Sequence, residues 1–152
     1  MTKRFLDSSI IFYAKQNSDK YKEFVSLISG QDILLVNNLV KLEVLQGINY
    51  KNNELYEKFV KLFENRFVIE EINKDIYEMS MKMDRLIKSK GITLKQGKTK
   101  DMAGVIDIIN FCTAKYYDCQ IHHNDADFDK LELHYQELLE VNSQNSNGNV
   151  NI

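Results

Sequence analysis

The sequence predicts an α/β protein: a three-layer α/β/α sandwich in which helices cover both faces of a mostly parallel central sheet. Short apolar runs typical of buried strands alternate along the chain with longer segments whose apolar residues recur at helical spacing. The chain has 152 residues, 43% of them hydrophobic and 28% charged, which suits one globular domain with one core. We expect that domain to span residues 1–140, followed by a disordered polar tail at 141–152.

The predicted elements follow the order expected for parallel strands joined by helical crossovers. In chain order they are a strand at 4–7, helices at 8–16 and 19–29, a strand at 32–36, helices at 37–49 and 54–65, a strand at 66–72, helices at 73–91 and 101–117, a strand at 119–123 and a short strand at 131–135. We find no internal repeat.

Capping residues define the ends of several of these helices. Side chains that can accept a hydrogen bond from the first helical turn precede four of them, namely Ser18, Asn37 or Asn38, Asn52 or Asn53, and Asn73. Gly30 and Gly91 follow two of the helices and are expected to end them.

Aspartates follow two of the predicted strands. Asp7 ends the first strand, and Asp125 is separated from the 119–123 strand by one residue. Because open parallel sheets bind ligands outside the carboxyl ends of their strands, both carboxylates are expected at the same edge. The alternative for Asp7 is an N-cap of the next helix. Asp125, Asp127 and Asp129 fall within five positions, and such bunched charges repel unless something positive lies among them.

Two further acids interrupt apolar helix faces. Glu43 has leucine and valine neighbours on both sides, and Asp107 lies within the apolar run AGVIDIINF. An acid in such a surround costs several kcal/mol unless it is paired or metal-bound. The alternatives are that Glu43 reaches water from the edge of the apolar stripe, and that small residues beside Asp107 only permit close packing. Asp101 competes with Asp107, but an acid in the first turn is favoured by the helix dipole in any case.

The four acids Asp7, Glu43, Asp107 and Asp125 therefore come from four separate elements. Convergence on a divalent cation explains all four positions together. Oxygen-only ligands favour magnesium or manganese over zinc or copper.

These residues resemble the PIN-domain nucleases of the VapC type, the toxin half of bacterial toxin–antitoxin pairs. Members begin with a strand that ends in Asp-Thr/Ser-Ser, and here the segment is FLDSSI. They carry a glutamate followed four residues later by glycine, here Glu43 and Gly47. They continue with Asp, a helix, a strand and Thr-x-Asp-x-Asp-Phe, and the interval from Asp107 to Asp125 is the usual one. The resemblance spans residues 4 to about 135.

The chain differs from this pattern at two places. His123 stands where the family has Thr or Ser, a residue that helps to orient the aspartate after it. Asn110 and Phe111 replace the small apolar pair that follows the third aspartate. These differences keep Asp101 as an alternative to Asp107, and Asp127 stays open as a residue that replaces or assists Asp125.

The resemblance implies a PIN-like fold and a metal-dependent endoribonuclease that hydrolyses RNA phosphodiester bonds. Asp7, Glu43, Asp107 and Asp125 would be its catalytic and metal-binding residues, with Mg²⁺ or Mn²⁺ as the cofactor. Asp7, Asp107 and Asp125 would ligate the metal, and Glu43 would ligate a second ion or orient the water. The implied partners are an RNA substrate, a small antitoxin that covers the acidic groove, and a second copy in a homodimer.

Charge and targeting signals add smaller constraints. The net charge of −2 makes no overall case for nucleic acid binding. Residues 82–100, however, hold seven Lys or Arg residues against the single acid Asp84, as phosphate-binding surfaces do. A solvated lysine face is the alternative. No apolar run is long enough for a membrane span, and the N-terminus lacks the features of a signal peptide, so we expect a cytoplasmic protein without membrane contact.

Histidines and cysteines are expected to have structural roles. Cys112 and Cys119 are predicted to be free thiols. His122 and His123 are neighbours on a strand, so their side chains point to opposite faces and do not readily share a metal. We expect His122 to be buried, and His123 to hydrogen-bond near Asp125 or to contact phosphate.

Two other functional classes fit parts of the sequence. The first is a non-catalytic PIN-like module that binds RNA or protein, which the histidine at position 123 favours. The second is a receiver-type phosphotransfer domain. Such domains need an acid pair after the first strand and an aspartate after a central strand, whereas Asp7 stands alone and the segment DILLVNN ends in asparagines.

Overall fold

The structure, a computed structural model, describes residues 1–13, 18–91 and 100–147. Within these residues four parallel strands form one sheet in the order β3-β2-β1-β4. The strands are β1 (Lys3–Leu6), β2 (Ile33–Asn37), β3 (Val68–Glu70) and β4 (Gln120–His122). The helices are α1 (Ser8–Tyr13), α2 (Ser18–Ser29), α3 (Asn38–Gln46), α4 (Asn53–Asn65), α5 (Lys74–Ser89), α6 (Lys100–Tyr116) and α7 (Asp127–Asn147).

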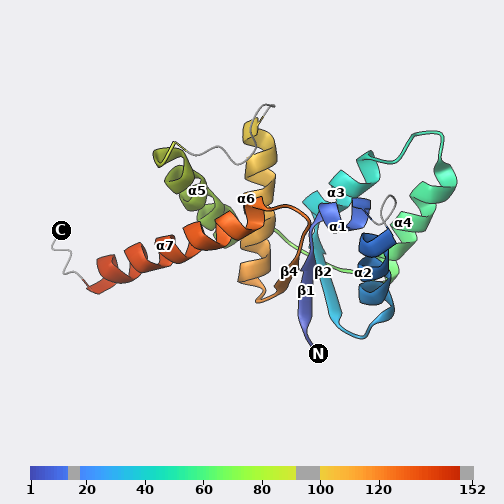
Figure 1. Cartoon of the computed structure of the whole chain (residues 1–152), viewed down its shortest axis with the longest axis horizontal. Coiled ribbons are helices and arrows are strands. Elements are labelled where there is room, and N and C mark those ends of the chain that lie inside the picture. The colour runs from blue at the N-terminus through green and yellow to red at the C-terminus, as the bar shows by residue number, and fades with distance from the viewer. Residues whose placement is uncertain (14–17, 92–99, 148–152) are drawn as a thin grey trace.

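Helices cover both faces of this sheet. Helices α1 to α4 lie on one side and α5 to α7 on the other, as Figure 1 shows. A hydrophobic cluster fills each side: the first includes Phe5, Val36 and Phe63, and the second includes Ile108 and Leu131. The predicted three-layer α/β/α sandwich with a parallel sheet is therefore confirmed.

The strand register defines the edge at which the carboxyl ends meet. Leu6 of β1 pairs with His122 of β4, and Asn37 of β2 pairs with Glu70 of β3. The backbone N–H of Asp7 extends the β1–β4 pairing by donating to the His122 carbonyl at 2.9 Å. The residues after β1 and β4 therefore begin side by side.

Most of the predicted caps are present. The side chains of Asn37, Asn52 and Asn73 accept hydrogen bonds from the first turns of α3, α4 and α5. Gly91 follows α5 with φ of +67°, a left-handed conformation that favours glycine. The sequence therefore encodes these helix boundaries locally.

The C-terminal segment differs from its prediction. The expected strand at 131–135 is wrong, because these residues lie inside α7. Phe128 and Leu131, three positions apart, are buried, whereas Leu133 is 71% exposed. The burial therefore follows helical spacing and not the alternation that predicted a strand. The helix continues through Asn147, into the segment for which we expected disorder, and residues 148–152 lie outside the described part of the chain. The predicted helix residues 14–16 lie outside it as well.

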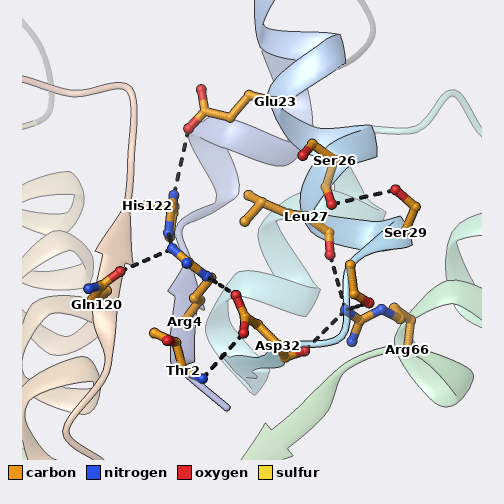
Figure 2. Close-up of polar contacts among 11 residues, drawn as sticks. Thr2, Arg4, Glu23, Ser26, Leu27, Ser29, Asp32, Arg66, Gln120 and His122 are labelled. Carbon is orange, nitrogen blue, oxygen red and sulfur yellow. Dashed lines mark hydrogen bonds and ion pairs between the residues drawn. The ribbon is translucent and has the colours of Figure 1, made fainter.

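Arg4 and its partners join β1 to its neighbours on the α2 side of the sheet (Figure 2). The Arg4 guanidinium donates to Asp32 at 2.6 Å, to Gln120 at 3.0 Å and to His122 Nε2 at 2.9 Å. The hydrogen bond from Arg4 holds the pKa of Asp32 below its usual value. We call Arg4 and these partners, together with Arg66 and the carbonyls described next, the arginine network.

Arg66, directly after α4, closes the C-terminal end of α2 (Figure 2). Its guanidinium donates to the backbone carbonyls of Leu27, Ile28, Gly30 and Asp32 at distances of 2.7 to 3.1 Å. The last carbonyls of a helix have no partner within the helix and carry partial negative charge, so a cation stabilises them. Arg66 thereby fixes α2 against α4 and the start of β2.

Both cysteines are free, as predicted. Burial raises the pKa of Cys112 to about 11 and that of Cys119 to about 11, which leaves both thiols protonated at neutral pH. Among the described residues, no helix combines the length and the apolar character that crossing a membrane requires.

Candidate metal centre

Three aspartates meet at the carboxyl edge of the sheet. Asp107 of α6, Asp125 of the loop after β4 and Asp127 at the start of α7 each offer a carboxylate oxygen, and these oxygens lie within 4.8 Å of one another. Two of the three, Asp107 and Asp125, are among the four acids predicted from the sequence. We call these three residues the acid cluster.

The loop after β4 is shaped so that its carboxylates turn inward. The Asp127 backbone N–H donates to Asp125 Oδ1 at 3.0 Å, and the Asp125 backbone N–H donates to His123 Nδ1 at 3.3 Å. Asp127 is 7% exposed and begins α7, where a negative charge is favoured by the helix dipole. Lys130 Nζ lies 3.8 Å from Asp127, and its own side chain is 58% exposed, so this cation stands at the outer rim of the cluster.

Asp7 is buried and is held by neutral donors, and it lies outside the group of three clustered aspartates. Its Oδ2 accepts from the Ser9 hydroxyl at 2.7 Å and from the Ser9 backbone N–H at 3.2 Å, and its Oδ1 accepts from Asn110 Nδ2 at 3.2 Å. The hydrogen bond from the Ser9 backbone N–H is the contact that an N-cap of α1 makes, which supports this alternative role for Asp7. Among the described residues no Lys or Arg forms an ion pair with Asp7.

Asp7 and its partner Ser9 each contact a residue close in sequence to one of the clustered acids. Asn110 lies three residues after Asp107 and therefore on the same face of α6. The Ser9 hydroxyl accepts a hydrogen bond from the backbone N–H of Asn124, the residue before Asp125, at 3.0 Å. Asp7 is thus placed between the segment that carries Asp107 and the loop that carries Asp125.

Glu43 lies on α3, outside the group of three clustered aspartates. Its Oε1 is buried, as is Oδ2 of Asp107. Glu43 as a whole is half-buried, so the alternative that it reaches water from the edge of its helix fits part of the side chain but not this oxygen. Asp101 is in the first turn of α6, but its side chain lies outside the described residues.

The two neighbouring histidines face different partners, as expected. The His123 ring stacks on Phe128 with 4.7 Å between centroids, and its Nδ1 accepts the Asp125 N–H, so it helps to orient the residue that follows. His122 faces Arg4 and lies 3.6 Å from Glu23. Burial lowers the pKa of His122, so this ring is neutral at neutral pH. Because Arg4 only donates, His122 Nε2 must accept and its proton sits on Nδ1.

The donor set suits a hard divalent cation. Every ligand atom offered by the acid cluster is a carboxylate oxygen, the type that Mg²⁺ and Mn²⁺ prefer. Carboxylate oxygens this close to one another repel, and a divalent ion would offset that repulsion. The residues present therefore fit such an ion.

The basic segment is only partly described. Lys82 and Arg85 are exposed on α5, whereas Lys88 pairs with Asp84 at 2.9 Å and Lys90 pairs with Glu137. Lys95 and Lys98 lie outside the described residues, as does the side chain of Lys100. Two of the four described cations are thus already in ion pairs.

The model of the PIN domain family matches residues 4–133. No curated protein sequence matches the chain. Three solved structures that match, each 14–16% identical in sequence, are of VapBC2 from Rickettsia felis bound to promoter DNA, of VapC20 from Mycobacterium tuberculosis, described as cleaving the sarcin-ricin loop, and of DNA-bound VapBC from Salmonella typhimurium.

These similarities extend over most of each chain. The Rickettsia structure gives a TM-score of 0.64, with 86% of this chain and 93% of that chain covered. The values for the Mycobacterium structure are 0.58, 84% and 93%, and those for the Salmonella structure are 0.52, 81% and 98%. At such low identity the structural similarity establishes the fold.

Proposed function

Because the chain belongs to the PIN domain family, we propose that it is a metal-dependent endoribonuclease and the toxin of a toxin–antitoxin pair. The observation that carries this proposal is the acid cluster at the carboxyl edge of the sheet. Asp7 is buried and contacts Asn110, one helical turn after Asp107. One solved structure of the same fold is described as a toxin–antitoxin complex and another as a toxin that cleaves the sarcin-ricin loop, which supports the assignment.

Each acid has an assigned part in this function. Asp7, Asp107 and Asp125 would hold Mg²⁺ or Mn²⁺, and Asp127 would supply a further oxygen that the four-acid prediction left open. Such an ion, when bound, would supply the positive charge that activates a water molecule and neutralises the attacked phosphate. Glu43 would orient that water or hold a second ion. Ser9 fixes Asp7, and His123 fixes the Asp125 backbone.

The RNA strand is assigned to the side of the molecule where α5 and the start of α6 lie. Lys82 and Arg85 are exposed there and carry charge for phosphate contacts. Charge reversal at both positions is expected to weaken RNA binding and to flatten its dependence on salt concentration. Equal salt dependence in wild type and variant would contradict this surface.

The resemblance implies an antitoxin that covers the acidic groove, and we propose that a second part of its chain binds a groove between α2 and α4. This groove encloses about 800 Å³ and is lined largely by apolar side chains, including Phe24, Val25 and Leu62. Lys58 and Lys61 stand exposed along it, so an amphipathic segment with acidic flanks complements it in shape and charge. A homodimer also belongs to the proposal, and light scattering of the purified protein tests it.

A substitution in this groove separates antitoxin binding from cleavage. Val25→Asp is expected to weaken pull-down of a co-expressed antitoxin while RNA cleavage stays unchanged. The matched control is Leu42→Asp, because Leu42 is also an exposed apolar residue but lies on α3. Equal loss in both variants would contradict the groove as the docking site.

Incubation of total RNA with the purified protein tests the catalytic proposal. Cleavage is expected with Mn²⁺ and not with chelator, and end-mapping should find 5′-phosphate and 3′-hydroxyl products. Asp125→Asn should abolish it, whereas Asp129→Asn is the matched control because Asp129 is a neighbouring exposed aspartate. RNA or protein binding without any cleavage would favour the alternative, a non-catalytic PIN-like module.

A further inference from the structure

A chain of buried amide groups leads from the start of α3 to Asp7. The Val40 backbone N–H donates to Asn37 Oδ1 at 3.0 Å, Asn37 Nδ2 donates to Asn110 Oδ1 at 2.9 Å, and Asn110 Nδ2 donates to Asp7 Oδ1 at 3.2 Å. Asn37 and Asn110 are both fully buried. The chain thus connects β2, α3, α6 and the end of β1.

Both ends of this chain fix the direction of its hydrogen bonds. A backbone N–H can only donate, so Asn37 must turn its oxygen toward Val40 and its NH₂ group toward Asn110. Asn110 then accepts with its oxygen, and its NH₂ group must face Asp7. An ionised carboxylate only accepts, so the last contact agrees with the first.

This arrangement suits a metal ligand better than an ion pair does. A buried carboxylate needs hydrogen-bond donors to remain ionised. A lysine or arginine at the position of Asn110 would supply them but would repel a divalent cation. A neutral amide holds the ionised carboxylate in one orientation and leaves its negative charge available.

We propose that Asn37 and Asn110 are positioning residues for the metal centre, forming an amide relay that orients Asp7 toward a divalent cation. The inference rests on the proposed function, since it assigns Asp7 to the cation. Partners of this kind, behind a first ligand, fix its orientation, and their loss costs about 10- to 100-fold in metal affinity.

The same network contains a branch that does not reach Asp7. Asn37 Nδ2 also lies 3.1 Å from the Thr113 hydroxyl, which donates to the Ile109 carbonyl at 2.7 Å. Thr113 is fully buried, like the two asparagines. Thr113→Val therefore removes a buried hydrogen bond from the network without breaking the path to Asp7, and it serves as the matched control.

The test is calorimetric titration of Mn²⁺ alone into the full chain, with urea unfolding of the metal-free protein measured beside it. Asn110→Leu removes both relay contacts and is expected to weaken Mn²⁺ binding by about 10- to 100-fold. Asn37→Ser keeps a helix-capping oxygen, which protects the fold, but loses the NH₂ group, so a smaller loss of affinity is expected. Thr113→Val should be destabilised and yet bind Mn²⁺ within about twofold of wild type.

Each outcome decides one point. Wild-type affinity in both asparagine variants would overturn the relay and leave the proposed function intact. Losses of affinity that merely follow the losses of stability, with Thr113→Val included, would also overturn it, because the network would then be structural only. Absence of Mn²⁺ binding to the wild-type protein would overturn the proposed function itself, and the relay with it.

Discussion

Arg4 lies near the start of β1, and Asp7 directly follows its end. The Asp32 carboxylate, which Arg4 binds, is held in a different way from the Asp7 carboxylate. In the arginine network, Asp32 is paired directly with the Arg4 guanidinium, and Arg66 closes the end of α2 (Figure 2). At the carboxyl edge, Asp7 receives only neutral donors, and three more aspartates gather close by. The Asp32 carboxylate is thus paired with a cation of the same chain, whereas the Asp7 carboxylate is held by neutral donors.

This difference assigns the two regions different physical roles. Ion pairs and hydrogen-bonded carbonyls stabilise the fold without a bound ligand or ion. Bunched carboxylates oppose folding unless an ion offsets their repulsion. The arginine network should therefore determine how stable the protein is, and the acid cluster should determine what it binds. Each prediction below perturbs one of these two regions.

The largest effect is expected from Asp125→Asn at the acid cluster. RNA cleavage should fall by at least about 1,000-fold, which corresponds to roughly 4 kcal/mol of transition-state stabilisation. The metal-free fold should be as stable as wild type or slightly more stable, because one of three bunched charges is gone. Comparison of single-turnover cleavage with urea unfolding checks both points, and a variant that still cleaves at the wild-type rate would contradict the assignment.

Metal binding should stabilise the protein through the same cluster. At an Mn²⁺ concentration of about 100 times Kd, the free energy of unfolding should rise by about 2.7 kcal/mol. Asp107→Asn should lose most of this gain in stability, whereas Arg66→Met, a variant of the arginine network, should keep it. Thermal unfolding with and without Mn²⁺ measures the difference, and an equal gain in both variants would argue against a shared metal site.

Arg66→Met should lower stability and leave metal binding and cleavage unchanged, the opposite of what we expect from substitutions in the acid cluster. It removes hydrogen bonds from a charged donor to four backbone carbonyls and should cost about 2 kcal/mol of stability. Methionine retains the apolar part of the side chain, so packing losses stay small. Cleavage by the folded fraction and Mn²⁺ affinity should remain unchanged. A reduced Mn²⁺ affinity would show that the two regions are coupled.

The smallest effect concerns acid pH and Asp32. The Arg4 hydrogen bond lowers the pKa of Asp32 from its ordinary value of 3.8, so the folded state favours the ionised form. Its contribution to stability is present above that ordinary value and is lost as the pH falls through the lower folded value. Asp32→Asn should therefore be less stable than wild type at pH 7, and the gap should close in strong acid. A gap independent of pH would contradict the ion pair.

Of the four predicted acids, the structure brings Asp107 and Asp125 together, and both were predictable from local patterns, an acid inside an apolar helix face and an acid after a strand. Asp7 and Glu43 lie outside that group. Asp127 was only partly predictable: its place in the Asp-x-Asp pattern hinted at a role, but only the start of α7 turns it inward.

The relay and the arginine network could not be predicted in the same way. Asn37 and Asn110 are 73 residues apart, and Arg4 and Gln120 are 116 apart, so their contacts depend on packing that no local pattern encodes. Asn37 was predicted as a helix cap, and nothing in its own segment shows its second partner. The false strand at 131–135 had the opposite cause, a local alternation that helix packing overrides.

Anomalous X-ray diffraction from crystals soaked in Mn²⁺ tests the central claim most directly. We predict an anomalous peak in contact with carboxylate oxygens of Asp107 and Asp125, with Asp7 facing the same ion. A crystal with Mn²⁺ bound elsewhere, or with none bound at saturating concentration, would contradict the account.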